Sequence, residues 1–338
     1  VSIEDKRNLF SDFDFHFEVF DFGIIPVELI SGIYETLLDA ETKDATSAVY
    51  TPPFLVDYIL TQTVDKFFED NKSTSECKIF DPAMGSGIFL VQGLRRMIER
   101  EKELNPTEDN QTFGNKIREI AERNLFGIDI NEEAINVACF SIYVALLDYQ
   151  EPGNIDQYIF PNLKDTNFFK AHFFDSAKVD VWNKIKTENI NFILGNPPWK
   201  SNNSTEHLNW LKETKFDKIV SDKQIAQSYL IRVKDFVEDE TIIALIVTSK
   251  VFYNNKADKF KQYFLKNNFL KECFDLSSVR RLVFEKADNP AMILFFKSNF
   301  NQEIINYNSI VNHISLKQNK FFNKFSKNLV IEKSDRKQ

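Results

Sequence analysis

The stretch that decides the fold is Asp81-Pro82-Ala83-Met84-Gly85-Ser86-Gly87-Ile88-Phe89-Leu90. It joins a short apolar segment, Cys77–Phe80, which predicts a strand, to Ile88–Glu103, whose apolar residues recur at helical spacing. Two of the nine glycines, Gly85 and Gly87, lie between these two segments. Because glycine has no Cβ, such a turn in a doubly wound sheet lets the backbone approach a nucleotide-like ligand closely.

The same stretch lacks the dinucleotide-binding fingerprint. Leu90 stands where a third glycine is expected, which weakens a pyrophosphate-binding interpretation. Taken alone, the stretch is also compatible with a strand–helix turn that binds no ligand.

Predicted strands and helices alternate on both sides of this turn. Such alternation indicates right-handed β–α–β crossovers and a mostly parallel sheet with helices on both faces. The sequence therefore predicts an α/β, doubly wound, Rossmann-like fold with an N-terminal helical extension. The further predicted strands are Leu125–Ile130, Asn191–Gly195, Ile242–Val247, Leu270–Leu276 and Ala291–Lys297. The further predicted helices are Thr51–Phe68, Ile117–Glu122, Glu132–Asp148, Trp182–Ile185, Ile225–Val237 and Phe260–Lys266.

Charge divides the chain into unequal parts. The net charge is −8, and residues 1–50, with 3 basic and 11 acidic residues, carry all of it. We predict an acidic, helical N-terminal segment at 1–50, a larger α/β domain at 51–298, and a linker or the start of a following domain at 299–338. The first residue, Val1, and the charged stretch Glu332–Gln338 suggest that both ends are cut points in a longer polypeptide. Removal of an initiator methionine is the alternative for the first end.

A cytoplasmic location is the expectation from what the sequence lacks. It contains no run of about 18 apolar residues that could span a bilayer, and no secretory signal. The three cysteines, Cys77, Cys139 and Cys273, are far apart and show no metal-binding spacing, which favours a reducing compartment. We expect no membrane partner and no metal.

A carboxylate stands at the end of the next predicted strand, in Gly127-Ile128-Asp129-Ile130. In doubly wound folds an acid at this place accepts hydrogen bonds from ribose hydroxyl groups. A solvated aspartate at the end of a strand is the simpler interpretation. One strand after the glycine turn, however, the acid favours a ligand that contains adenosine.

The loop after the third of these strands begins Asn196-Pro197-Pro198-Trp199. Two prolines after a buried strand impose an extended and rigid exit. The Asn196 side chain and the Pro197 carbonyl can accept both hydrogens of an amino group, and Trp199 can stack on the ring that carries it. In isolation, the tetrapeptide is more typical of an ordinary Pro-Pro turn with a buried tryptophan.

Four motifs follow one another along the chain: Thr51-Pro52-Pro53-Phe54, Asp81–Leu90, Gly127–Ile130 and Asn196–Trp199. In this order they resemble the S-adenosylmethionine-dependent N6-adenine-specific DNA methyltransferases, as arranged in type I modification subunits and type IIG restriction–modification enzymes. The resemblance covers about residues 26–297. It implies a Rossmann-like methyltransferase fold with its catalytic domain at 51–298, S-adenosylmethionine as cofactor, and double-stranded DNA with an adenine target as partner.

The resemblance assigns cofactor contacts residue by residue. They are Thr51 and Pro52 near the methionine end, Asp81, Ala83, Gly85 and Gly87 at the centre, and Asp129 and Ile130 at the ribose and adenine. His172 stands where an acid is expected to meet the cofactor's adenine amine. Phe173, through its backbone, and Asp175 are the two candidates to replace that acid.

The resemblance also implies a mechanism. The adenine N6 is a poor nucleophile because its lone pair is delocalised into the ring. Asn196 and Pro197, in the loop that Pro198 stiffens, would accept its two protons and aim the nitrogen at the methyl group. The base must first leave the duplex, and Trp199 and Phe284 would then stack on its two faces.

Seven basic and three acidic residues between 256 and 281 give a net charge of +4 after this loop. Contacts with DNA phosphates are plausible there, although a solvated helix face is the commoner meaning of such charge. The basic residues are Lys256, Lys259, Lys261, Lys266, Lys271, Arg280 and Arg281.

Two other functions fit parts of the pattern. Asn-Pro-Pro-aromatic loops also serve enzymes that methylate protein glutamine or RNA, but these usually lack the upstream Thr51-Pro52 segment. A non-catalytic cofactor-binding module of a restriction complex is the second alternative, against which the intact Asn196–Trp199 loop argues. The recognition sequence would be chosen by a target-recognition domain or specificity subunit outside this chain.

Overall fold

A mixed sheet forms the centre of the computed structural model, which describes residues 51–107, 109–199, 204–284, 289–299 and 311–316. Its strand order is β3-β2-β1-β4-β5-β7-β6-β8, and among these strands only β7 runs antiparallel to its neighbours. The strands are β1 (Ile79–Asp81), β2 (Leu125–Asp129), β3 (Phe168–Lys170), β4 (Phe192–Gly195), β5 (Ile242–Thr248), β6 (Asn268–Asp275), β7 (Ala291–Ser298) and β8 (Asn312–Ser315).

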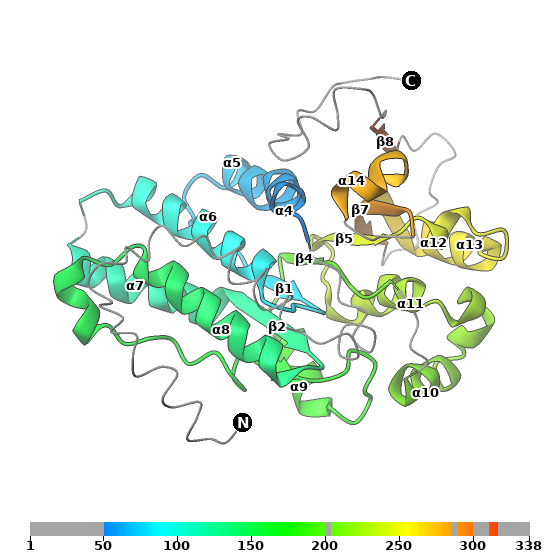
Figure 1. Ribbon diagram of the computed structural model, residues 1–338, viewed down its shortest axis with the longest axis horizontal. Coiled ribbons are helices and arrows are strands. Elements are labelled where there is room, and N and C mark those ends of the chain that lie inside the picture. Colours follow the sequence, from blue (N-terminus) through cyan, green and yellow to red (C-terminus); the bar gives the residue numbers. More distant parts are fainter. Residues whose placement is uncertain (1–50, 108, 200–203, 285–288, 300–310, 317–338) are drawn as a thin grey trace, which may run out of the picture.

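Helices cover both faces of the sheet, which confirms the predicted doubly wound fold (Figure 1). On the first face lie α4 (Pro53–Leu60), α6 (Ile88–Leu104), α7 (Asn110–Asn124) and α8 (Glu132–Leu147). On the second face lie α9 (Val179–Lys186), α10 (Thr205–Glu213), α11 (Ile225–Arg232) and α13 (Asp258–Asn267). The shorter helices are α5 (Lys66–Asp70), α12 (Lys250–Tyr253) and α14 (Arg280–Val283). A π-helical segment, Thr61–Asp65, joins α4 to α5.

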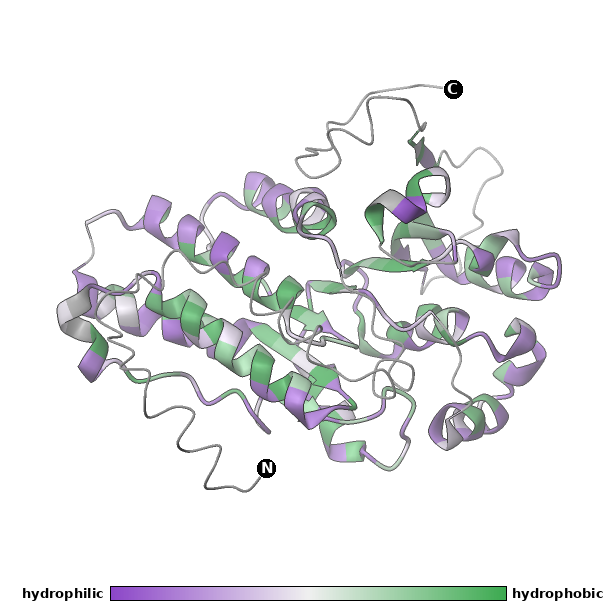
Figure 2. Ribbon diagram, in the orientation of Figure 1, coloured by the Kyte–Doolittle hydropathy of each residue, from purple (hydrophilic) through white to green (hydrophobic). Residues whose placement is uncertain are grey.

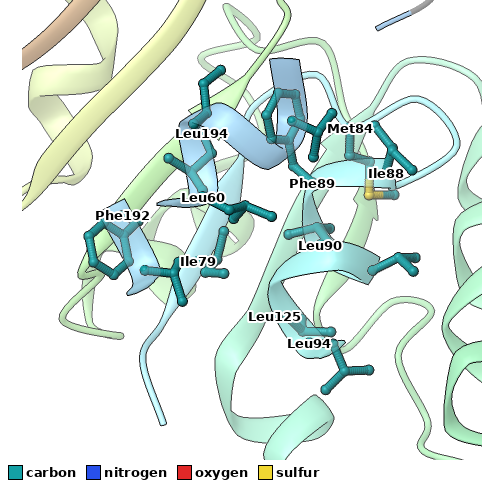
Figure 3. Packing of buried hydrophobic residues seen from close by; sticks show 14 of the residues in the cluster. Leu60, Ile79, Met84, Ile88, Phe89, Leu90, Leu94, Leu125, Phe192 and Leu194 are labelled. Carbon is teal, nitrogen blue, oxygen red and sulfur yellow. The ribbon is translucent and has the colours of Figure 1, made fainter. Parts of the chain in front are cut away.

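The pleat of the strands explains why two cores form. Successive side chains of a strand point to opposite faces, so Phe192 and Leu194 join the first-face core while Ile193 joins the second. Figure 3 shows the first-face core, where Leu60 and Leu90 pack near Ile79. The strands are accordingly apolar over most of their length, whereas the helices carry both apolar and polar residues (Figure 2). Burial on both faces is typical of a sheet with parallel crossovers.

The predicted elements recur with shifted ends, and five of the helices and strands given above are not predicted from the sequence. Helix α7 begins at Asn110 rather than Ile117, because the Asp109 side chain accepts hydrogen bonds from the backbone N–H groups of its first turn. The helices and strands without a sequence prediction are β3, α10, α12, α14 and β8. Strand β8 pairs with β6 although it lies beyond the domain boundary that we predict at residue 298, and that boundary stays a prediction.

The predicted N-terminal segment, 1–50, lies outside the described residues, as does most of 299–338. Among the helices of the described part of the chain, none has the length and apolar character needed to cross a membrane.

Candidate cofactor and catalytic site

The turn after β1 contains the two predicted glycines, and the structure shows that both adopt a left-handed conformation. Gly85 has a φ of +52° and Gly87 a φ of +81°, a region that other residues rarely adopt. A Cβ on Gly87 would lie 3.0 Å from the Cβ of Ala138 on α8, whereas a Cβ on Gly85 would meet nothing within 4 Å. Gly87 therefore permits close packing of the helix, and Gly85 borders open space in which a ligand can lie.

Backbone hydrogen bonds fasten this turn to the end of β2. The carboxylate of Asp129 accepts from the Gly85 N–H at 3.0 Å and from the Asn131 N–H at 2.8 Å. The Met84 N–H donates to the Ile128 carbonyl at 3.0 Å. Burial raises the pKa of Asp129, and these amide hydrogen bonds oppose the rise. Hydrogen bonds thus join the Asp81–Leu90 turn to the Gly127–Ile130 motif at the carboxyl edge of the sheet, as the fold predicts.

Asp81 is a buried carboxyl group at the centre of this edge, 1% exposed. It accepts a hydrogen bond from the Ala83 N–H at 3.0 Å, and among the described residues it has no ion pair. Burial is the main cause that raises the pKa of Asp81 to about 8; the Ala83 hydrogen bond opposes the rise, and the nearby Asp129 carboxylate adds to it. Gly195, at the end of β4, leaves room for Asp81, because a Cβ there would lie 2.7 Å from its Oδ1. We did not predict Gly195 as a site residue, although the scarcity of glycine was a usable signal.

A cavity of about 580 Å³ opens beside β2 and β3. Three of the predicted or discussed residues, Ile130, His172 and Asp175, line it together with Lys170 and Ser204. Ile130 is 42% exposed, which is unusual for a large apolar side chain next to a sheet. The resemblance assigns the adenine of the cofactor to Ile130, and this assignment stays a prediction.

The side chain of Phe173 points away from this cavity into the second-face core. Its ring is buried and stacks on Tyr229 with centroids 4.7 Å apart. Any contact with a ligand would therefore use its backbone, as we predict. Asp175 uses Oδ1 to accept from the Ala177 N–H at 2.9 Å.

The Asn196 side chain joins two motifs of the predicted site, Thr51–Phe54 and its own, Asn196–Trp199. Its Nδ2 donates to the Thr51 hydroxyl at 3.1 Å, and its Oδ1 accepts from the Trp199 indole N–H at 3.0 Å. Pro52 is the N-cap of α4, so Thr51 is held just ahead of that helix. These two contacts fix which end of the amide is the acceptor. Pro197 is buried, and Pro198 is partly buried.

Trp199 and Phe284 lie together, but their rings do not face one another. Their centroids are 4.9 Å apart and the ring planes meet at 80°, an edge-to-face contact. Both rings are buried in the first-face core. A base between two parallel ring faces therefore requires at least one of the rings to turn, and this stacking role stays a prediction.

The cysteines are not activated thiols. Cys77, Cys139 and Cys273 are all free and buried, and burial raises the pKa of each thiol. A nucleophilic cysteine needs the opposite shift. None of the three cysteines therefore fits the role of a nucleophile.

Comparison with known proteins gives the same picture. Residues 123–284 match the Eco57I restriction-modification methylase family. The type II methyltransferase M.BstVI of Geobacillus stearothermophilus is 21% identical over 265 residues, which are 76% of this chain and 43% of that protein. The adenine-specific methyltransferase PglX of Streptomyces coelicolor is 28% identical over 128 residues, which are 38% of this chain and 10% of that protein. The chain thus spans less than half the length of these curated relatives.

Solved structures share the fold. The type IIL restriction–modification enzyme MmeI in complex with DNA has a TM-score of 0.61 at 16% identity, over 81% of this chain and 40% of that one. A type I methyltransferase subunit from Streptococcus thermophilus has a TM-score of 0.53 at 17% identity, over 88% of this chain and 54% of that one. The chain is therefore similar in sequence to restriction–modification DNA methyltransferases, and it shares the fold of these solved restriction–modification enzymes.

Proposed function

We propose that the chain transfers a methyl group from S-adenosylmethionine to the N6 amine of a flipped-out adenine in double-stranded DNA, as the modification part of a restriction–modification system. The observation that carries this proposal is the Asn196 amide, which Thr51 and Trp199 orient at the carboxyl edge of the sheet. The turn after β1 lies at the same edge, so a methyl donor and an amine could meet there.

The site fits S-adenosylmethionine in shape and charge. Gly85 leaves open space, and the cavity beside Ile130 and Asp175 offers room for an adenine ring. The buried Asp81 carboxyl group lacks an ion pair among the described residues, and a cationic ligand would supply the opposite charge. The bound cofactor supplies a methyl group on a positively charged sulfur. The residues that would hold it are Thr51, Pro52, Asp81, Ala83, Gly85, Gly87, Asp129, Ile130, Phe173 and Asp175.

The chain's own contribution to the reaction is to hold the amine. A carbonyl oxygen has two lone pairs, so Asn196 Oδ1 can accept a hydrogen from the adenine amine while it keeps the bond from Trp199. The Pro197 carbonyl accepts the second hydrogen. Two acceptors on one amine draw its nitrogen toward tetrahedral geometry and expose its lone pair, and they need no reorganisation when the reaction occurs.

Adenine rather than another amine is favoured by the relatives. PglX is named an adenine-specific methyltransferase, and MmeI and the enzyme DrdV were solved with DNA. Inside a duplex the N6 amine cannot be reached by such a loop, so the base must be flipped at a cost of a few kcal/mol. Trp199 and Phe284 would replace part of the stacking that the base loses.

The basic region at 256–281, after the catalytic loop, contains exposed side chains that could contact DNA phosphates. Lys256 and Lys261 are engaged with Asp222 and Asp258 in exposed ion pairs. Lys259, Lys266 and Arg281 are exposed, and they could reach phosphates. The recognition sequence itself would be read by a target-recognition domain or a specificity subunit outside this chain.

Methyl transfer from tritium-labelled cofactor to unmethylated DNA tests the proposal. Label recovered as N6-methyladenine after nucleoside digestion is the expected result. Label on protein or RNA alone would instead support the glutamine- or RNA-directed alternative. Cofactor binding without transfer to any of the three would support the non-catalytic alternative.

An Asn196→Ala substitution tests the mechanism. We expect a rate about 100- to 1,000-fold lower, with binding of S-adenosylhomocysteine largely kept, because the amide contacts the base rather than the cofactor. Asn183→Ala, on the exposed side of α9, is the matched control and should behave as the unmodified chain. An Asn196→Ala enzyme that methylates at the normal rate contradicts the proposed mechanism.

A further inference from the structure

His172 is an imidazole whose two nitrogens both have partners. Its Nδ1 lies 3.2 Å from the backbone N–H of Phe174, which can only donate. Nδ1 is therefore the acceptor, and in the neutral ring the proton sits on Nε2. Nε2 lies 2.9 Å from the Ser204 hydroxyl oxygen and donates to it. Burial lowers the pKa of His172, which keeps the ring in this neutral form.

Ser204 is the first residue described after the catalytic loop, and it is also the N-cap of α10. Its hydroxyl oxygen accepts from the backbone N–H of His207 at 3.4 Å. His207 is fully buried and its Nε2 lies 2.8 Å from the Ser228 hydroxyl on α11. Phe174, two residues after His172, contacts the rings of both His207 and Trp210. The start of α10 is thus fixed to the turn that follows β3.

We use the term catalytic segment for the chain from Asn196 to Ser204, and its two described ends are held on opposite faces of the sheet. Trp199 belongs to the first-face core, with Phe284. Trp210, on the helix that Ser204 caps, belongs to the second-face core. Trp199 and Ser204 are thus the two described residues at which the chain is tied to the first and the second face, respectively. His172 and Ser204 both line the 580 Å³ cavity.

We propose that His172 is a positioning residue, which holds the end of the catalytic segment against the wall of the cofactor cavity through its hydrogen bond to Ser204. This inference rests on the proposed function. Phe174 and Ser204 engage both ring nitrogens of His172. Neither nitrogen is therefore left to accept a hydrogen bond from the cofactor, and the ring contacts the segment behind Asn196 and Trp199 instead. A ligand bound in the cavity would then change the stability of the hydrogen bond that holds the end of that segment.

Two amide substitutions separate the two nitrogens of the ring. His172→Asn places an acceptor near the position of Nδ1 and keeps the bond from Phe174, but it loses the donor to Ser204. His172→Gln reaches the position of Nε2 and keeps a donor for Ser204. Ser204→Gly keeps most of the helix cap, since glycine is a tolerated N-cap, but removes the acceptor. Ser204→Asp keeps both the cap and the acceptor.

Steady-state methylation is the first readout. We expect His172→Asn and Ser204→Gly to lower kcat about 5- to 10-fold, with less than a twofold change in KM for the cofactor. His172→Gln and Ser204→Asp should recover most of the kcat that His172→Asn and Ser204→Gly lose. The double variant His172→Asn/Ser204→Gly should be no worse than either single one. A raised cofactor KM in His172→Asn together with an unaffected Ser204→Gly would overturn the inference, because His172 would then contact the cofactor directly.

Hydrogen exchange of the α10 amides is the second readout, and it needs no methyl transfer. S-adenosylhomocysteine should slow exchange at Thr205–Glu213 in the unmodified chain and in His172→Gln, but not in His172→Asn. This result with an inactive chain would uphold the inference and count against the proposed function. If the ligand does not bind, faster exchange of the α10 amides in His172→Asn than in His172→Gln still supports the hydrogen bond between His172 and Ser204 as the element that holds the segment. Equal exchange in the two variants overturns the inference.

Discussion

The turns after β1 and β2 and the loop after β4 share one edge of the sheet but are held differently. The first two are fastened by backbone N–H groups: Ala83 to Asp81, Gly85 to Asp129, and Met84 to the carbonyl of Ile128. The described part of the loop after β4 is held by side chains, with Asn196 between Thr51 and Trp199. Side chains can change rotamer without unfolding the backbone, whereas the amide contacts of the turns cannot be given up singly.

This difference matches what each region is proposed to bind. A cofactor that is the same in every cycle is best met by a preformed cradle. A base that enters from a duplex must move the side chains that fill its binding site. At the position expected for the base, Trp199 and Phe284 pack edge to face. We therefore expect substitutions in the turns to act on stability and cofactor binding, and substitutions in the loop to act on the rate.

The largest effect is expected from the glycines of the first turn. Gly87→Ala should lower the free energy of unfolding by about 2–4 kcal/mol, from the left-handed backbone and from the 3.0 Å approach to Ala138. Gly85→Ala meets open space and should cost only about 1–2 kcal/mol, but it should weaken binding of S-adenosylhomocysteine. Urea unfolding and calorimetric titration measure the two effects. Equal losses of stability with unchanged affinity in both variants would break the comparison.

A smaller effect is expected from the titration of Asp81. Its folded pKa of about 8 lies above the unfolded value of about 3.9, so the folded state binds the extra proton and the free energy of unfolding falls as the pH rises between these values. The lowered pKa values of His172 and His207 act with the opposite sign below about pH 6.5. Between pH 6.5 and 8 we expect a loss of about 1–2 kcal/mol, measured by urea unfolding.

Asp81→Asn is the control for this titration, since it keeps the shape of the side chain but cannot ionise. Its free energy of unfolding should fall less across pH 6.5–8 than that of the unmodified chain. If the free energy of unfolding fell equally with pH in the two proteins, a group other than Asp81 would cause the pH dependence.

The smallest effect is expected from Trp199→Phe. The ring face remains, but the N–H that bonds Asn196 Oδ1 is lost, at a cost of about 1 kcal/mol. The methylation rate should fall roughly fivefold, while unfolding by urea and affinity for S-adenosylhomocysteine change little. Trp182→Phe, on α9 and in the second-face core, is a matched control for the loss of an indole N–H, because that group donates to the Asp175 carbonyl instead. If Trp199→Phe impaired cofactor binding as strongly as the rate, the separation between turns and loop would fail.

The sequence predicts the fold best at positions where the residue type restricts the backbone conformation. Gly85 and Gly87 predict a turn with close backbone approach, and the structure adds that both have a positive φ. Apolar runs such as Ile242–Val247 predict buried strands, which the structure contains. The edge strand β3 has only three residues, Phe168–Lys170, too few for a periodic pattern. Strand β8 is largely exposed, so its residues carry no burial signal.

The site was predictable to the level of motifs but not of contacts. Nothing in the spacing showed that the Asn196 amide would lie between Thr51 and Trp199, since Thr51 is 145 positions away in sequence. Ser204 did carry a signal, because a serine before the helical pattern His207, Trp210 and Leu211 is a typical N-cap. Its contact with His172, 32 positions away, comes only from the folding of α10 against the turn after β3.

The orientation of the Asn196 amide also bears on which bases can be accepted. With its nitrogen engaged by the Thr51 hydroxyl and its oxygen bonded by the Trp199 indole, the side chain presents an acceptor and cannot flip without losing both bonds. Under the proposed function, adenine and cytosine meet this acceptor with an exocyclic amine. Guanine and thymine would bring a carbonyl oxygen to the same place, and two facing acceptors repel. The same two hydrogen bonds that fix the loop would therefore exclude keto bases before any chemistry begins.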